Sequence, residues 1–115
     1  MKKLKTDVVI IGAGPIGLFS VFQCGMMGLK TQIIDSSNII GGQCTTLYPE
    51  KNIYDIPAYK NILSKDLIKN LISQSETFKP NYHLGQNVDI VYKVNNNWNI
   101  KTSKNIKSLF YKINL

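Results

Sequence analysis

The sequence is poor in the residues that build metal and disulfide sites, with one histidine and two cysteines among its 115 residues. With His83 alone, a histidine-rich metal cluster is excluded. Cys24 and Cys44 form no CxxC motif, so they indicate neither a disulfide framework nor a zinc site. Cys24 falls in an apolar segment, where we expect a small buried side chain. This usage suits a reducing compartment, and we expect a cytoplasmic protein.

Arginine is absent, and all 14 basic residues are lysines, set against 7 acidic residues. The excess positive charge lies at the two ends: residues 1–5 carry +3 and residues 90–115 carry +5, whereas residues 6–89 sum to −1. Nucleic-acid binding would be better supported by arginines and aromatics interleaved along one face, so we expect no nucleic-acid partner. The lysine-rich tail is expected to be solvated surface, or to help dock an acidic protein.

One run, Val8 to Leu29, contains no charged side chain and is long enough to cross a membrane. However, three glycines and a proline fall within six of its residues, where a spanning helix needs continuous hydrogen bonding. A secretion signal is disfavoured because Asp7 interrupts the approach and no small-residue cleavage site follows. We therefore expect no membrane association.

The same run fits a dinucleotide-binding pattern. Thr6 to Ile11 has the β-branched composition of a buried parallel strand. Residues 12–17, GAGPIG, match GxGxxG, and Leu18 to Met27 follow as an apolar helix that stops at Gly28. Lys30 to Asp35 is a second strand that closes on an acid at the expected spacing. The alternative is a glycine-rich turn with no ligand.

Each residue type in this pattern has a physical task. Gly12 permits the tight turn out of the strand, and Gly14 lets a pyrophosphate approach the backbone. Gly17 lets the helix pack tightly on the sheet, and Pro15 suits its first turn. The free N–H groups at that helix end would face the phosphates. Asp35 would accept hydrogen bonds from ribose hydroxyls.

Beyond this unit, Gly41 and Gly42 would let backbone approach a ligand across the same sheet edge, and Gln43 adds an amide that donates and accepts. Residues 47–57 are irregular and contain two tyrosines, which either serve a site or pack into a local core.

The second half of the chain predicts a helix and a hairpin. Ser64 is expected to cap the helix, with Asp66 in its first turn and Pro80 as its stop. Its apolar stripe comprises Leu67, Ile68, Leu71, Ile72 and Phe78. Residues 88–94 and 98–102 are predicted strands that flank a turn of three asparagines.

Three segments together carry a family resemblance: TDVVIIGAGPIGLFSVFQCGMMGLKTQIID, then GGQ, then LYPEKNIYDIPAY. They resemble the start of a thioredoxin-reductase-like ferredoxin/flavodoxin–NADP(+) reductase. The glycine motif is shared by many flavoproteins, GGQ narrows the field, and the LYPEK segment is similar to the ferredoxin-reductase branch. The match runs from Thr6 to Val88, only about the first quarter or third of such an enzyme.

The resemblance implies an α/β fold: a Rossmann-like FAD-binding βαβ unit with a parallel sheet and a β-hairpin or meander crossover. It implies a homodimeric cytoplasmic flavoprotein in which hydride passes from NADPH to FAD and electrons then leave to ferredoxin or flavodoxin. Residues 1–115 would be the N-terminal part of a discontinuous FAD-binding domain. The NADPH domain and the C-terminal FAD-domain segment would be absent from this chain.

The resemblance also implies cofactor contacts at matching positions. The three motif glycines would hold the FAD pyrophosphate, and Asp35 would hold its adenosine ribose. Gln43 and Tyr48 would contact FAD further along, towards the flavin. Val88 would meet the adenine through its backbone. No catalytic acid or base and no metal ligand are predicted, since hydride transfer to a flavin does not demand them.

The sequence departs from the family at its end. The family shows a strand that runs into a glycine turn beside FAD, whereas Ser108 to Leu115 contain no glycine. We therefore expect a fragment, a truncated product or a frame disrupted near residue 103, which binds FAD poorly and is not catalytically competent alone. Two alternatives stay open: a thioredoxin reductase, or a degenerate non-catalytic nucleotide-binding module.

Overall fold

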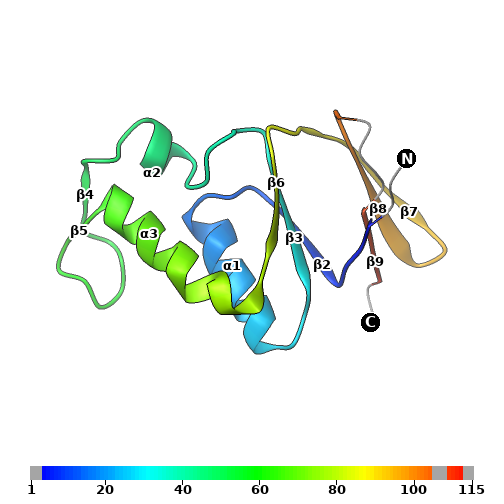
Figure 1. The fold of residues 1–115 in the computed structure, drawn as a ribbon, viewed down its shortest axis with the longest axis horizontal. Helices are drawn as coiled ribbons and strands as arrows, with labels where there is room; N and C mark the ends of the chain where they lie inside the picture. The colour runs from blue at the N-terminus through cyan, green and yellow to red at the C-terminus, as the bar shows by residue number, and fades with distance from the viewer. Residues whose placement is uncertain (1–3, 105–108, 113–115) are drawn as a thin grey trace.

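The computed structural model describes residues 4–104 and 109–112. Along the chain, strands and helices alternate in the first half, and a group of antiparallel strands follows (Figure 1). The elements are β1 Leu4–Lys5, β2 Val8–Ile11, α1 Pro15–Met26, β3 Thr31–Asp35, α2 Gln43–Thr46, β4 Asn52–Ile53, β5 Ile62–Leu63, α3 Ser64–Ser75, the 3₁₀ helix η1 Glu76–Phe78, β6 Asn81–Leu84, β7 Val88–Val94, β8 Asn97–Thr102 and β9 Leu109–Lys112.

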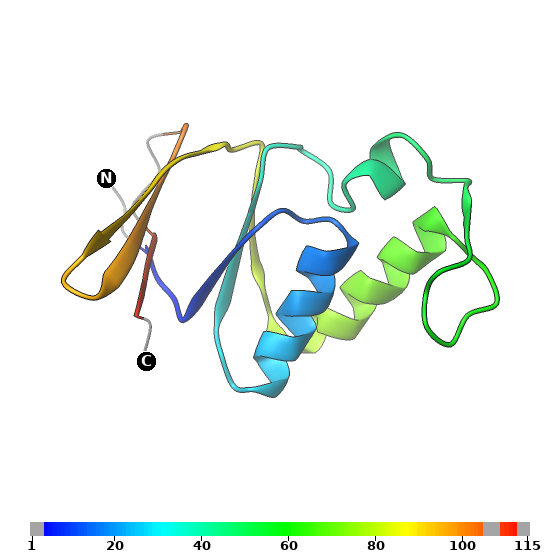
Figure 2. The ribbon, with the colours of Figure 1, turned by 180° about the vertical axis from the view of Figure 1, so that it is seen from behind.

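A parallel sheet in the order β2–β3–β6 forms the centre of the fold. Helices α1 and α3 pack against each other on one side of it, and the antiparallel strands lie on the other side (Figures 1 and 2). Successive residues of β3 serve both faces: Ile33 packs with Ala13 and Val21 on the helix side, whereas Ile34 packs with Ile100. This three-layer arrangement confirms the predicted α/β class with its parallel sheet and hairpin.

The antiparallel strands belong to a second sheet in the order β1–β9–β8–β7. Strands β7 and β8 form the predicted hairpin, but its loop has two residues instead of three. Asn95 and Asn96 have φ of 47° and 67°, as a type I′ turn requires, and Asn97 already belongs to β8. Of the glycine-free segment 108–115, the structure describes only β9; the other residues of that segment lie outside the described ranges.

The uncharged run at the start divides between β2, a glycine loop and the 12-residue helix α1. Within residues 4–104 and 109–112, no helix has the length and apolar character needed to cross a membrane. The molecule is elongated, with extents of 47 × 29 × 20 Å.

Two expectations about local structure are wrong, and one strand lies where none is predicted. Ser64 does not cap α3, because Leu63 holds that position and the Ser64 hydroxyl donates to the Lys51 carbonyl at 3.2 Å. Cys24 is half-buried instead of buried, and this partial burial raises the pKa of its thiol. The strand β6 was not predicted, although Tyr82 on it packs against the core.

Candidate functional site

Loops that follow the parallel strands gather at one edge of the sheet. Strands β2, β3 and β6 run in the same direction, so their carboxyl ends share this edge (Figure 1). The glycine loop follows β2, residues 36–42 follow β3, and residues 85–87 follow β6. Such an edge is where open α/β sheets bind ligands.

The first loop turns out of the sheet at Gly12. Its φ of 110° is a conformation that L side chains rarely adopt, and its N–H donates to the Ile34 carbonyl at 2.8 Å. Gly14 differs, because its φ of −79° and ψ of −173° suit any residue. A Cβ at Gly14 would also have no heavy atom within 4 Å. Nothing in the described part of the chain therefore requires glycine at 14, and the space in front of it is open.

Gly17 and Pro15 set the start of α1. Pro15 occupies the first helical turn, where its missing N–H costs no hydrogen bond. A Cβ on Gly17 would overlap the Gly12 carbonyl oxygen and would lie 3.4 Å from Ile10 Cγ2. The absence of this Cβ therefore lets α1 lie close to the glycine loop and, to a smaller degree, close to the sheet.

Asp35 fastens three loops together through hydrogen bonds that the sequence does not reveal. Its Oδ2 accepts from the Ala13 N–H at 2.7 Å, and its Oδ1 accepts from the Ser37 N–H at 2.7 Å. Its backbone carbonyl accepts from the Gln86 N–H at 3.0 Å. The carboxylate therefore holds the glycine loop in place while it also borders the site.

A cavity of about 270 Å³ lies at this junction and brings together three of the predicted residues, Gly12, Asp35 and Val88. Gln86 and Asn87 supply further amides to its wall, and the Gln86 side chain is held by a hydrogen bond from Thr102 Oγ1 at 2.9 Å. Sequence reasoning missed both amides, although they directly precede Val88. The full lining is Ile11, Gly12, Ile34, Asp35, Ser36, Gln86, Asn87 and Val88.

The second glycine pair lies directly against the first loop. A Cβ on Gly42 would be 3.4 Å from Gly14 Cα, and the Gly41 N–H donates to the Ala13 carbonyl at 2.9 Å. Gly42 has φ of 61° and precedes α2. These contacts place the predicted Gly42 beside Gly14, so the two loops form one continuous backbone surface.

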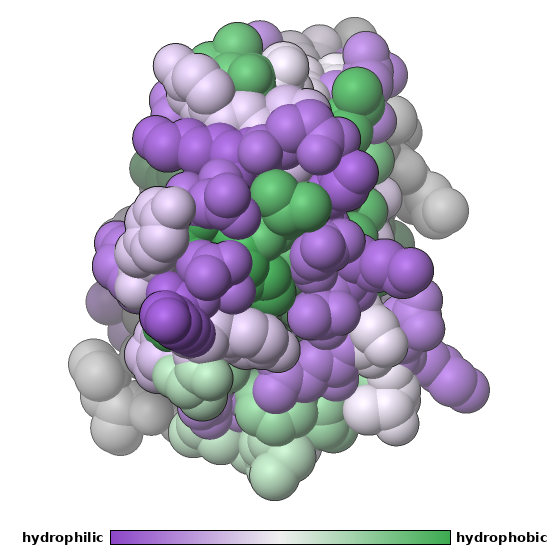
Figure 3. Space-filling view, turned by 90° about the vertical axis from the view of Figure 1, so that its left-hand side faces the viewer, coloured by the Kyte–Doolittle hydropathy of each residue, from purple (hydrophilic) through white to green (hydrophobic). Residues whose placement is uncertain are grey.

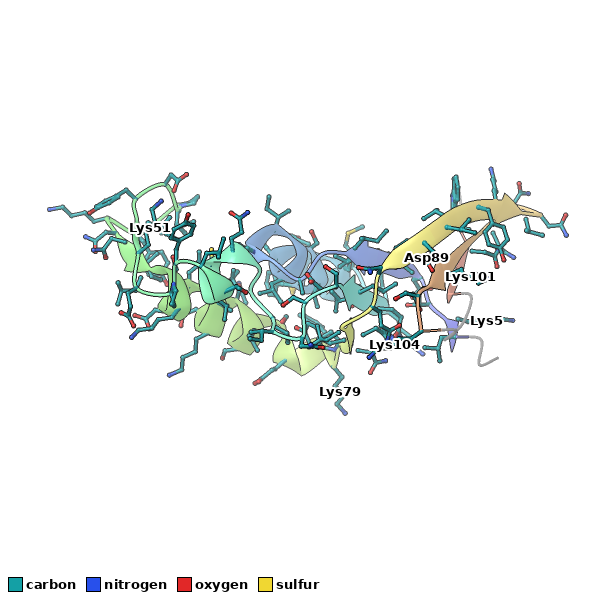
Figure 4. All side chains as sticks on the ribbon, turned by 90° about the horizontal axis from the view of Figure 1, so that it is seen from above. Lys5, Lys51, Lys79, Asp89, Lys101 and Lys104 are labelled. Carbon is teal, nitrogen blue, oxygen red and sulfur yellow. The ribbon has the colours of Figure 1, made fainter. Side chains whose placement is uncertain are left out.

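Gln43 and Tyr48 line a separate hollow of about 390 Å³, further along the same edge. Tyr48 is 53% exposed, and Lys51 Nζ lies 5.3 Å from the centroid of its ring. Figure 4 views the molecule from above, with Lys51 near one end and Asp89 in the other half of the molecule. Figure 3 shows the end where β4 and β5 lie, with apolar surface enclosed by hydrophilic side chains.

The predicted residues therefore form two groups on one edge. Asp35 and Val88 share the first cavity, Gln43 and Tyr48 share the second hollow, and Gly14 and Gly42 meet each other. The structure does not bring all of them into one pocket. An extended ligand would be needed to contact both groups at once.

Comparisons with known proteins agree with this geometry. Residues 10–66 match the model of an NAD(P)-binding Rossmann-like domain. The ferredoxin–NADP reductase of Rickettsia prowazekii is 59% identical over 100 residues, which cover 87% of this chain and 30% of that protein. The ferredoxin–NADP reductase of Rickettsia felis is 61% identical with the same coverage. The chain thus spans about 30% of the length of these curated relatives.

Solved structures show the same fold. The thioredoxin reductase of T. acidophilum superimposes with a TM-score of 0.79 at 21% identity, covering 96% of this chain and 34% of that one. That of Lactococcus lactis gives 0.76 at 22% identity, covering 93% and 33%. Over the matched residues the chain is therefore similar in sequence to ferredoxin–NADP reductases, and it has a Rossmann-like fold that thioredoxin reductases share.

Proposed function

We propose that this chain is the nucleotide-binding part of an FAD-dependent oxidoreductase that passes electrons between NADPH and ferredoxin or flavodoxin. One observation carries the proposal: Gly12, Asp35 and Val88 border one cavity, beside the open face of Gly14. The names of relatives at 59–61% identity support the electron-transfer reaction.

The residues present fit the adenosine diphosphate part of FAD. The open face of Gly14 and the N-terminus of α1 would accept the pyrophosphate, because free N–H groups and the positive end of the helix dipole favour anions. Asp35 would accept hydrogen bonds from the ribose, and the Val88 backbone would contact the adenine. Gln43 and Tyr48 would lie towards the flavin. When bound, FAD supplies the redox chemistry, and this chain positions it.

The remaining parts of the proposal concern the longer protein to which this chain would belong. Residues 1–115 would be the N-terminal part of a discontinuous FAD-binding domain, with NADPH bound by another domain. The working protein would be a cytoplasmic homodimer. These features follow from the family resemblance, and the coverage of about 30% of the relatives supports a partial domain.

A chimera tests the function. The matching 100 residues of the Rickettsia prowazekii enzyme are replaced by those of this chain, and the product is purified without added flavin. We expect a yellow protein with one FAD per chain that transfers electrons from NADPH to ferredoxin. A folded, colourless chimera without affinity for FAD would refute the proposal.

The 115-residue chain alone should behave differently. Because it spans about 30% of its relatives, most of the surface that encloses a flavin in a longer reductase is expected to come from elsewhere. We expect weak FAD binding or none in isothermal titration calorimetry. A stoichiometric yellow complex would contradict this expectation.

A further inference from the structure

Gln86 places a buried amide in the wall of the first cavity. The residue is 7% exposed and lines the cavity together with Asp35 and Val88. Its Oε1 accepts a hydrogen bond from Thr102 Oγ1 at 2.9 Å, and within residues 4–104 and 109–112 its side chain has no other hydrogen bond. The N–H groups of its Nε2 are therefore without a partner in this part of the chain, and a buried donor is costly to leave unpaired.

The position of this amide is fixed through both its backbone and its side chain. The Gln86 N–H donates to the Asp35 carbonyl at 3.0 Å, so the loop after β3 holds the backbone. The end of β8 holds the next residue: the Asn87 N–H donates to Ser103 Oγ at 3.0 Å, and the Asn87 carbonyl accepts from the Ser103 N–H at 2.9 Å. Thr102 fixes the end of the Gln86 side chain. A donor that is already ordered loses little conformational freedom when it binds a ligand.

Asp35 supplies the opposite kind of group to the same cavity. Its two carboxylate oxygens offer about four lone-pair positions, and the N–H groups of Ala13 and Ser37 each occupy one. Asp35 can therefore still accept from a ligand, whereas Gln86 donates. A hydroxyl group suits such a pair because it donates its hydrogen and accepts at its oxygen. A purine ring nitrogen would satisfy the donor alone.

We propose that Gln86 Nε2 donates a hydrogen bond to a ribose hydroxyl oxygen of the bound adenosine, while Asp35 accepts from the ribose. The inference rests on the nucleotide-binding part of the proposed function, because it takes the adenosine of FAD as the ligand. It adds a contact residue that the family resemblance does not include. It also adds a chemical criterion for the ligand: the cavity selects a nucleotide that carries ribose hydroxyls.

ADP is the probe, because all residues that line this cavity belong to the 115-residue chain. Nuclear magnetic resonance follows the amide signals of the chain, including the side-chain NH₂ of Gln86, as ADP is added. We expect the Gln86 signal to shift, with a dissociation constant in the millimolar range. The analogue 2′,3′-dideoxy-ADP lacks both ribose hydroxyls and should bind at least about tenfold more weakly, since it loses the hydrogen bonds to Asp35 and Gln86.

Substitutions at Gln86 test the donor itself. Gln86→Met removes the donor without adding a charge and should weaken ADP binding at least about fivefold, as expected for the loss of one hydrogen bond. The same variant should leave the affinity for 2′,3′-dideoxy-ADP unchanged. Gln86→Glu keeps an acceptor for Thr102 but has no donor when ionised, so it should also weaken ADP binding. Gln74→Glu makes the same change on an exposed residue of α3 and should have no effect.

Equal affinity of the unmodified chain for ADP and 2′,3′-dideoxy-ADP would overturn the inference, as would the absence of any shift at millimolar ADP. Gln86→Met that weakens both nucleotides by the same factor would also overturn it, because a purely structural role predicts that result. The chimera reports separately on the proposed function. A yellow, active chimera would stand even if ADP binding ignored Gln86, and ribose-dependent ADP binding through Gln86 would stand even if the chimera were colourless.

Discussion

At the scale of single residues, Gly14 and Gly17 differ in what makes a side chain unfavourable at each position. At Gly17 the obstacle belongs to the protein, namely the Gly12 carbonyl oxygen. At Gly14 the protein offers no obstacle, so any requirement for glycine there comes from a ligand. Single substitutions separate these two cases.

Gly14→Val should leave the stability of the 115-residue chain within about 0.5 kcal/mol, as expected for a substitution that meets no obstacle. In the chimera the same change should abolish FAD retention, because the added methyl groups occupy the space of the pyrophosphate. Circular dichroism melting of the chain and the flavin absorbance of the chimera check both parts. Undiminished FAD content would count against the pyrophosphate assignment.

Gly17→Ala should behave in the opposite way and destabilise the chain. Alanine is the better helix former by about 1 kcal/mol, but the overlap with the Gly12 carbonyl is expected to cost about 1–3 kcal/mol and to displace the loop. Urea denaturation measures the difference from the unmodified chain. Equal or higher stability would show that the loop yields without cost.

Asp35→Asn tests the carboxylate as the fastener of the loops. The amide keeps one acceptor oxygen but turns an NH₂ donor towards a backbone N–H, so one of the bonds to Ala13 and Ser37 is lost. We expect a loss of about 1–3 kcal/mol, as for a buried donor left unpaired. Exchange of the Ala13 amide should accelerate. The exposed Asp55→Asn serves as the control, and an unchanged exchange rate would contradict the role.

At the scale of elements, the contact between α1 and the segment after α3 depends on a missing side chain. A Cβ on Gly25 would overlap the ring of Phe78, which also meets Phe22 edge-on with centroids 5.9 Å apart. This contact holds the two helices together on one face of the sheet.

Gly25→Ala should therefore lower the stability, even though alanine favours helices. The overlap involves Cγ and both Cδ atoms, so the whole ring must leave its packed position, and we expect a cost of about 1–3 kcal/mol. Phe78→Ala removes the obstacle, so the double variant should lose less than the sum of the two single variants. Urea denaturation of all four proteins completes the cycle, and strict additivity would refute the contact.

The first βαβ unit could be predicted because each of its elements carries a local signal. Strand β2 is a β-branched run, α1 follows a glycine turn, and β3 ends on an acid. Strand β6 lacks such a signal, since its sequence NYHL is mostly polar. It is a strand because it pairs with β3. His83 Nε2 on β6 lies 2.7 Å from Gln32 Oε1 on β3. Only the folded chain brings these partners together.

At the site, too, local sequence patterns could be predicted, whereas contacts between distant residues could not. The sequence predicts which residues would face a ligand, because glycines after a strand and an acid after the next strand form a known spacing. It does not indicate the bond from Ala13 to Asp35, which joins residues 22 positions apart. It also does not show that Gln43 and Tyr48 line a different hollow from Asp35, since that depends on how residues 36–42 cross the edge.

At the scale of the whole molecule, apolar side chains are exposed on α1 as well as on β7. On α1, Ile16 near its start is 85% exposed and Met26 at its end is 65% exposed. Together with β7, they leave two separate apolar surfaces on one small chain. Surfaces of this kind normally mark contacts with other polypeptide.

The elongated shape leaves the chain with more accessible surface than a compact protein of its mass would have. The chain has 7541 Å² of accessible surface, whereas about 6,300 Å² is expected for a compact protein of 13.0 kDa. The excess of about 1,200 Å² is surface that a compact shape of this mass would bury. Association with a second copy would stabilise only the folded form, so a melting temperature that rises with protein concentration in calorimetry would be its signature, and a constant one would exclude it.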